Sequence, residues 1–321
     1  MRLLKLVPPD TRIDFLGRWR WAIGFTATST IASILLLITV GLNFGIDFRG
    51  GTAMIVQTPQ PVAVSELRAA VAGLNVGEIQ VTEIGGGVTD AKPQALVRIV
   101  EQGDDPDVQA AAIQAVRDAL TRAVPGLTVQ SVESVGGKVS AELVEAGVLA
   151  VVLAVLAVMV YVWLRFEWQF AVGAVVSLVH DVLLTLGLFA LLQIEFNLPI
   201  VAAILTIIGY SLNDTVIVFD RVRENLRKYK KMPLAELINM SVNETLSRTI
   251  MTSFTTLLAL IALYVIGGPV ISGFTFAMIW GVVIGTYSSI FVAGVVLNWL
   301  GVDRSDKPSA KAGTQFADID A

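Results

Sequence analysis

The chain has 321 residues, of which 55% are hydrophobic and 16% are charged, and its formal net charge is −4. An ordinary soluble domain carries about 25% charged residues, so this composition excludes that class and indicates a membrane protein. The chain contains no cysteine, which excludes disulfides, thiolate metal sites and cysteine nucleophiles.

Six apolar segments have the length of about 18 residues or more that the hydrocarbon core of a membrane requires. They lie at 21–40, 144–164, 168–192, 198–219, 249–267 and 272–299. The first has basic flanks like a signal peptide, but no small-residue cleavage pattern follows its long apolar core, so we predict an uncleaved anchor. The predicted domains are a basic N-terminus (1–20), a first transmembrane helix (21–41), a water-exposed domain (42–142), five further helices (143–300) with a loop at 220–247, and a disordered tail (301–321).

Lysine and arginine are unevenly distributed among the predicted connections. Residues 1–20 contain five and residues 219–248 contain seven, whereas 193–197 and 266–269 contain none. Because basic residues favour the cytoplasmic side of a membrane, we predict that both termini and the 220–247 loop are cytoplasmic. The domain at 42–142, with seven basic and twelve acidic residues, then faces outward.

The outward domain alternates strand-like and helical patterns. Strands are predicted at 52–58, 78–84, 95–100 and 127–135, and helices at 65–74 and 107–123. This βαββαβ order is the ferredoxin-like, or split-βαβ, pattern. The run Gly85-Gly86-Gly87 lacks a P-loop lysine and a following helix, so we interpret it as a hairpin connection rather than a nucleotide site. The acidic balance of the domain argues against nucleic-acid binding.

Glycine-containing motifs flank this domain, NFGIDFRGGT at 43–52 and VGGKVSAEL at 135–143. Glycine permits tight turns that other residues rarely make. Asp47 and Arg49 can satisfy backbone groups, or each other, at the membrane boundary. We interpret Asp47, Arg49, Gly50 and Gly51 as a structural hinge or collar between the first membrane helix and the domain.

The fourth apolar segment contains a carboxylate, Asp214, within the stretch GYSLNDTVIVFDR (209–221). A charged side chain near the bilayer centre costs about 2.5 kcal/mol or more, so such groups normally face a bundle interior and find a partner. Five polar residues fall within a helical sector of about 120° and predict a polar face: Thr206, Tyr210, Asn213, Asp214 and Asp220.

Arg248, at the start of the fifth apolar segment, is the predicted counter-charge of Asp214. A nearby cation favours a charged carboxylate and burial disfavours it, so an aspartate under both influences could bind and release a proton. The residues alone leave an equal alternative. In that alternative the pair only joins two helices, or Arg248 is anchored among lipid head groups.

His180 and Asp181 lie deeper, in the third apolar segment. At 1.5 Å per residue from Trp168, His180 is about 18 Å into the membrane. Histidine has the side-chain pKa nearest neutral pH, so His180, Asp181 and Asp220 are candidates for a proton relay. A neutral imidazole bonded to Asp181 would serve helix packing equally well, and the sequence does not decide between the two.

The loop after the fourth segment begins with the strongly basic RVRENLRKYKKM (221–232), and Pro233 starts a predicted amphipathic helix that extends through Ser247. Its basic residues either contact anionic lipid head groups or only fix the topology. In the last segment, Gly281, Gly285 and Ser289 form a stripe of small residues that predicts a helix-packing surface.

Four motifs, in this order, resemble those of the SecF family, the smaller membrane subunits of the SecD/SecF protein translocase pair: GIDFRGGT, VGGKVSAEL, GYSLNDTVIVFDRVREN (209–225) and SVNETLSRTIMTSFTT (241–256). The resemblance covers the chain up to residue 302. It implies a multi-pass protein of the bacterial cytoplasmic (inner) membrane with six transmembrane helices, half of a resistance-nodulation-division (RND) bundle. It also implies that Asn213, Asp214 and Arg248 belong to a proton pathway.

The implied function is an accessory role in protein export. With SecD, the chain would use the proton motive force to promote translocation of unfolded preproteins after the SecYEG channel. No cofactor or metal is predicted, and no enzyme, because no nucleophile is paired with a base. The alternative is a proton-coupled transporter or channel half for a small solute, but the repeats or broken helices expected of that class are not visible in the sequence. A third class, a scaffold that only holds SecD beside the channel, would tolerate loss of Asp214.

Overall fold

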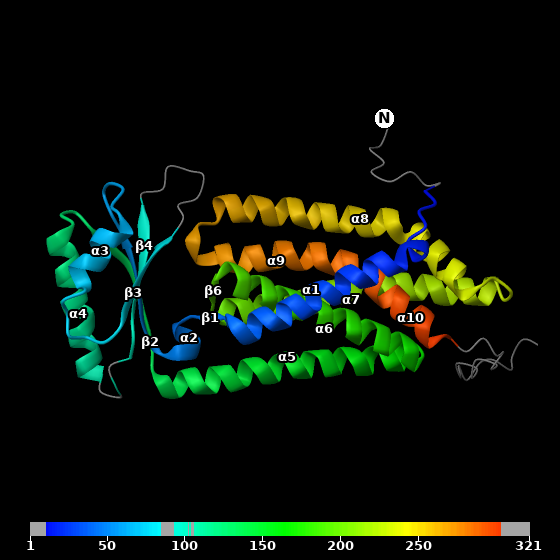
Figure 1. Ribbon diagram of the computed structural model, residues 1–321, viewed down its shortest axis with the longest axis horizontal. Coiled ribbons are helices and arrows are strands. Elements are labelled where there is room, and N and C mark those ends of the chain that lie inside the picture. The colour runs from blue at the N-terminus through cyan, green and yellow to red at the C-terminus, as the bar shows by residue number, and fades with distance from the viewer. Residues whose placement is uncertain (1–10, 85–92, 102, 104–105, 303–321) are drawn as a thin grey trace, which may run out of the picture.

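The structure is a computed structural model that describes residues 11–84, 93–101, 103 and 106–302. Most of the predicted tail at 301–321, the predicted hairpin connection at 85–87 and the first ten residues lie outside the described residues. The described chain forms a bundle of long helices with an α/β domain at one end (Figure 1). We refer to the two ends of the bundle as the domain end and the far end.

In the described part of the chain, six helices are long and apolar enough to cross a membrane, as predicted. Their bounds are α1 Trp19–Thr39, α5 Gly137–Arg165, α6 Trp168–Leu192, α7 Leu198–Lys228, α8 Leu234–Ile266 and α9 Pro269–Ser288. A 3-10 turn, Leu16–Arg18, precedes α1, and a π-helical turn, Ser289–Ala293, joins α9 to α10 (Gly294–Leu300) within the sixth span. The chain is therefore a multi-pass membrane protein.

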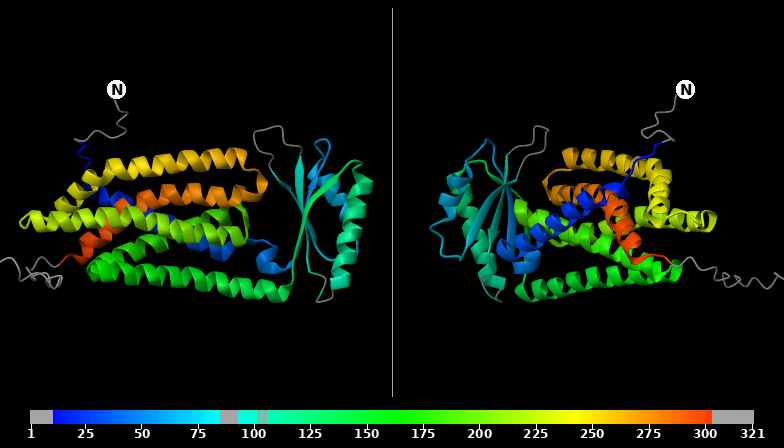
Figure 2. Two further views of the ribbon diagram at one scale, coloured as in Figure 1. Left: turned by 180° about the vertical axis from the view of Figure 1, so that it is seen from behind. Right: turned by 45° about the vertical axis from the view of Figure 1, so that its right-hand side comes forward.

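Helices α7 and α8 continue well past the apolar segments predicted from the sequence. Only residues 229–233 separate them, and the predicted amphipathic helix and fifth span are one helix. Figure 2 shows the pair projecting beyond the other helices at the far end. The extension is stabilised because Leu237, Ile238 and Ser241 of α8 are buried. Arg221 on α7 also bonds Glu244 on α8 at 2.6 Å.

The bundle core centres on the contact between α7 and α9. A side chain at Gly281 would clash with Ile207, and one at Gly285 would press on Ser211. The small-residue stripe of the sixth span therefore lets α9 approach α7 within this chain, which confirms a packing surface there. Buried apolar residues continue along the bundle on both sides of this contact, from Ile200 and Ile204 at the domain end to Val218 and Val222 at the far end.

The α/β domain contains a four-stranded antiparallel sheet in the order β3-β4-β2-β5. Its elements are β2 Gly51–Gln57, α3 Val64–Val71, β3 Ile79–Ile84, β4 Gln94–Ile99, α4 Pro106–Ala123 and β5 Thr128–Val135. Both the element order and the strand order are those expected of the predicted βαββαβ pattern. Helices α3 and α4 cover the sheet face turned away from the bundle (Figure 1). Met54, Val97 and Leu120 are buried between them.

Three short elements join the domain to the bundle: β1 (Asn43–Phe44), α2 (Ile46–Arg49) and β6 (Glu195–Phe196). Strand β1 pairs in parallel with β6, which lies between α6 and α7. Gly50 and Gly51 have φ values of 74° and 109°, in the left-handed region that favours glycine. A side chain at Gly51 would also collide with the backbone oxygen of Ile99, so the turn into β2 requires glycine.

Candidate functional site

Asp214 lies on the inward face of α7 and is only 1% exposed. Among the described residues, neither of its carboxylate oxygens has a hydrogen-bond partner. Buried polar groups in proteins are nearly always paired, so a buried carboxylate without a partner is an exception that calls for a functional explanation. Ser211 and Thr215, one turn before and one residue after, are buried with it.

The predicted polar face of α7 is divided between two environments. Asp214 points inward, whereas Thr206, Asn213 and Asp220 are exposed. The predicted sector of about 120° is wide, so it includes side chains that point into the bundle and side chains that point to its surface. Tyr210 is half-buried and its hydroxyl bonds Thr256 of α8 at 3.3 Å. Asn213 and Asp220 therefore lie on the outer surface of this chain rather than beside Asp214.

Arg248 is exposed on α8 and does not contact Asp214. The ion pairs that α7 makes in the described part of the chain use Asp220, Arg221 and Glu224, and none joins Asp214 to Arg248. The expected direct counter-charge is therefore absent from this structure, because Arg248 faces the surface while the next residue, Thr249, faces the core.

Asp181 is the centre of a buried hydrogen-bond network. Its Oδ2 accepts hydrogen bonds from Ser211 of α7 at 2.6 Å and from Ser288 of α9 at 2.8 Å. Its Oδ1 lies 3.1 Å from Nδ1 of His180 on the same helix, α6. Since Asp181 and His180 are 1% and 4% exposed, the network joins three helices away from solvent.

His180 extends this network toward α1. Its ring lies 6.2 Å from that of Tyr287, whose hydroxyl donates a hydrogen bond to the backbone oxygen of Ala22 and bonds Thr26, both in α1. Its second ring nitrogen, Nε2, is buried and has no partner among the described residues. The bond between His180 and Asp181 that the packing alternative required is therefore present, and it leaves the second ring nitrogen without a partner in the described part of the chain.

Of the two buried acids, Ser211 bonds only Asp181 among the described residues. It donates to Asp181 and lies three residues before Asp214, which is one turn, or about 4.5 Å, along α7. A hydroxyl can donate and accept hydrogen bonds at once, so it is chemically suited to pass a proton between neighbouring groups. Ser211 and Ser288 were not predicted as site residues from the sequence. The only available signal was the i, i+3 spacing of Ser211 and Asp214.

Asp220 is separate from this network. It forms an ion pair with Arg165 of α5 at 3.3 Å, and both side chains are largely exposed. It lies six residues beyond Asp214, or about 9 Å along the helix axis. The structure thus groups Asp181 and His180 with the Asp214 region and leaves Asp220 at the surface.

The domain-junction residues lie in α2 and at its C-terminal end, where β2 begins. Asp47 accepts a hydrogen bond from the backbone N–H of Leu198 at 2.7 Å. Arg49 is exposed, and among the described residues it forms no ion pair with Asp47. In the part of the chain that the structure describes, no group of three or more potential metal-ligating side chains is found.

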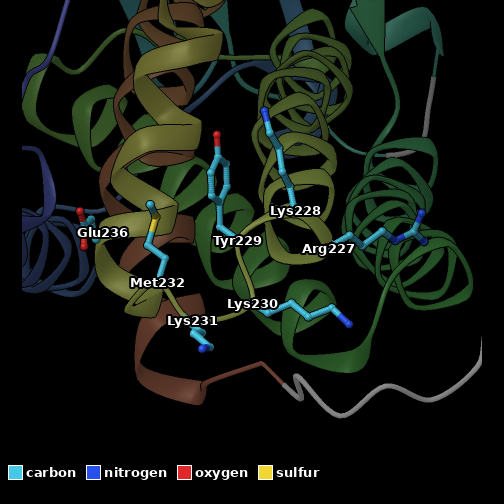
Figure 3. Close-up of a pocket in the computed structure, with 7 residues that line it drawn as sticks. All are labelled: Arg227, Lys228, Tyr229, Lys230, Lys231, Met232 and Glu236. Atoms are coloured by element: carbon cyan, nitrogen blue, oxygen red, sulfur yellow. The ribbon is translucent and has the colours of Figure 1, made fainter.

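A basic pocket lies at the turn between α7 and α8, at the far end. Figure 3 shows the seven side chains around it: Arg227, Lys228, Tyr229, Lys230, Lys231, Met232 and Glu236. Lys228 also lies 5.0 Å above the Tyr229 ring. Four cations with one carboxylate make this turn strongly electropositive.

Two family models match the chain. Residues 115–303 match the C-terminal region of the SecD/SecF protein export membrane proteins, and residues 35–62 match the SecD/SecF GG motif. The protein translocase subunit SecF of Cereibacter sphaeroides is 53% identical over 320 residues, which is 99% of both chains. The chain belongs to the SecF family. It is thereby a protein translocase subunit of the SecD/SecF export machinery rather than a member of an enzyme family.

Other relatives agree with this assignment. The SecF subunit of Rhodobacter capsulatus is 51% identical over 94% of this chain and 93% of its own length. The SecDF subunit of Brucella abortus is 42% identical over 97% of this chain, which spans only 40% of that relative. In the family, a single polypeptide can therefore contain both a SecF region and a SecD region.

Solved structures of SecDF share the fold. The crystal structure of SecDF from Thermus thermophilus, described as a translocon-associated membrane protein, is 34% identical with a TM-score of 0.82. The match covers 92% of this chain and 39% of that one. A SecDF crystal structure in a super-membrane-facing form has a TM-score of 0.64 at the same identity, over 91% of this chain and 39% of that one.

Proposed function

We propose that this SecF-family chain, together with SecD, uses the proton motive force to promote translocation of unfolded polypeptides after the SecYEG channel. The observation that carries the proposal is the carboxylate of Asp214, which is buried inside a membrane helix and has no hydrogen-bond partner among the residues that the structure describes. Ionisable groups within membrane spans are costly and typically mark proton or ion pathways. A proton gradient can do work through such a group if the helices move when it gains or loses a proton.

The neighbouring residues have distinct roles in this proposal. Asp214 binds and releases the proton, and Arg248 approaches it in a second arrangement of α7 and α8 in which the carboxylate is charged. Ser211, Asp181 and His180 relay protons between α7 and the interior of the bundle. Asn213, which precedes Asp214 in the sequence but faces the outer surface of α7, lines the path by which protons reach the site from a partner helix.

The partners follow from the family and from the shape of the chain. SecD supplies the other half of the membrane assembly, because SecDF relatives contain both regions in one polypeptide. We place both termini and the basic turn in the cytoplasm of a bacterium, with the turn against anionic lipid head groups of the inner membrane. The α/β domain then lies on the opposite side and contacts the polypeptide in transit.

The test compares Asp214→Asn with Asp220→Asn, a matched change on the same helix. Asparagine keeps the size and hydrogen-bonding capacity of aspartate but cannot bind and release a proton. In vesicles that contain SecD and SecYEG, at equal subunit abundance, we expect Asp214→Asn to lose most of the export stimulated by an imposed proton gradient. Asp220→Asn should retain it, because the exposed pair that it breaks contributes about 1 kcal/mol or less.

Either of two results would contradict the proposal. Full gradient-stimulated export by Asp214→Asn would make Asp214 a structural group only. Equal loss in both variants, with normal abundance, would show that charge anywhere on α7 is what matters.

A further inference from the structure

The α/β domain is attached to the bundle at the first residue of α7, the helix that carries Asp214. Asp47 in α2 accepts the hydrogen bond from Leu198 N–H at 2.7 Å, and the N-cap residue Asn197 makes no side-chain cap of its own. A carboxylate is favoured at a helix N-terminus because the first N–H groups lack intrahelical partners and the helix dipole is positive there. Asp47 therefore binds the start of α7 to the segment that enters the domain.

Arg98 provides a second attachment. It lies in β4, an inner strand of the sheet, and forms an ion pair with Glu195 in β6. It also donates a hydrogen bond to Asn43 in β1 at 3.3 Å. The Arg98 and Glu195 side chains are 12% and 25% exposed, so the pair is largely shielded from water. Charge-assisted bonds of this kind are about twice as strong as neutral ones.

Aromatic packing reinforces the joint. Phe196 of β6 contacts Phe44 of β1 and Phe48 of α2, with ring centroids 6.0 and 5.7 Å apart. Phe189 of α6 packs on Phe196 as well, at 6.3 Å. The start of α7, the entry to the α/β domain and the end of α6 thus form one packed unit.

The exit from the domain is also tied. Glu101, just after β4, accepts a hydrogen bond from the backbone N–H of Gly137 at 2.7 Å, where α5 begins. Ser140 of α5 donates to the backbone oxygen of Ile46 in α2 at 3.3 Å. A domain that swung freely about Gly50 and Gly51 would have to break these bonds as well as the Arg98 ion pair.

We propose that Asp47, Arg98 and Glu195 form a clamp that transmits movement of α7 to the α/β domain. Arg98 and Glu195 are then positioning residues for proton-coupled export. This inference rests on the proposed function, because Asp214 is taken as the origin of the displacement. Asp214 lies sixteen residues after Leu198, or about 24 Å along the helix, and a helix transmits shift and rotation along its axis. Attachment at two separate points, before β2 and on β4, transmits rotation as well as translation.

The test reverses the charges of the pair singly and together, as Arg98→Glu, Glu195→Arg and the double exchange. Arg117→Glu, an exposed position on α4 of the same domain, is the matched control. Export and discharge of an imposed proton gradient are measured in vesicles with SecD and SecYEG, at equal subunit abundance. Each single reversal should lower gradient-stimulated export about fivefold or more, since a typical coupling between sites changes affinity by about 5- to 150-fold, while the gradient is still discharged. The double exchange should restore most of the export, and the control should match wild type.

Three results would overturn the clamp. They are full export by both single reversals, no recovery in the double exchange at normal abundance, or equal loss of export and gradient discharge. Asp214→Asn, measured alongside, separates the two proposals. If it retains gradient-stimulated export, the proposed function fails. If it loses export while the reversals do not, only the clamp fails.

Discussion

Asp181 shows how one buried acid can hold three helices together. It belongs to α6 and accepts hydrogen bonds from serines of α7 and α9. A buried acceptor that loses one donor retains part of its desolvation cost, so each serine hydroxyl is expected to contribute to stability as well as to proton transfer. A comparison of Ser288 with Ser289 isolates the contribution of the bond to Asp181. Both residues are fully buried, but of the two only Ser288 bonds Asp181.

We predict that Ser288→Ala destabilises the purified chain by about 0.5 to 2 kcal/mol, the range seen for interhelical hydrogen bonds in membranes. Ser289→Ala is the control, because within the described chain the Ser289 hydroxyl bonds only the backbone oxygen of Thr286 in its own helical turn. The measurement is thermal unfolding in detergent, where Ser288→Ala should lower the melting temperature and Ser289→Ala should not. Equal melting temperatures for the two variants would mean that the Asp181 network contributes no stability.

The approach of helices α7 and α9 depends on glycine. A Cβ at Gly281 would overlap three side-chain atoms of Ile207, whereas Gly209, on the exposed face of α7, has open space around it. We predict that Gly281→Ala destabilises the chain by about 1 to 3 kcal/mol through overpacking. Gly209→Ala should be neutral or stabilising by up to about 1 kcal/mol, because alanine is the better helix former. The same unfolding assay measures both, and a stable Gly281→Ala variant would show that Ile207 can give way.

The sequence predicted the elements better than their ends. Apolar run length identified the six spans, and alternation identified all four strands of the α/β domain, since both patterns are local. The sequence did not predict that α7 continues past residue 219, or that the predicted amphipathic helix (233–247) and the fifth span are one helix. These polar parts are stabilised by contacts between helices, such as Arg221 with Glu244. Hydropathy indicates which segments lie in the membrane core. It carries no information about helices that stabilise each other outside the membrane.

The sequence identified candidate site residues but did not show how they are arranged in space. Asp214, His180 and Asp181 were found because a charge within an apolar run is visible in the sequence. The bonds from Ser211 and Ser288 to Asp181 join segments 30 and 107 residues away, so no local pattern reveals them. The inward-facing side of α7 could not be predicted either, because Asn213 and Asp214 are adjacent in the sequence and only packing against other helices determines which of them is buried.

At the scale of the whole molecule, β5 forms one edge of the sheet in the α/β domain. This edge was not identified from the sequence. Strand β5 pairs only with β2, and it ends the described order of the sheet. Val132 in this strand is 40% exposed. An unpaired strand edge can bind an extended polypeptide by main-chain hydrogen bonds, a mode that tolerates any sequence and therefore suits unfolded cargo.

We therefore predict that a photo-crosslinker at Val132 captures a stalled secretory protein and that one at Thr121, exposed on α4, does not. Helices α3 and α4 cover the face of the sheet away from the bundle, so Thr121 samples the same domain without an open strand edge (Figure 1). The assay uses the complete chain with SecD and SecYEG and a preprotein halted during translocation. Equal capture at both positions would indicate contact by proximity alone. Capture of SecD in place of the preprotein at Val132 would mean that β5 is a subunit interface and that the domain acts as a spacer.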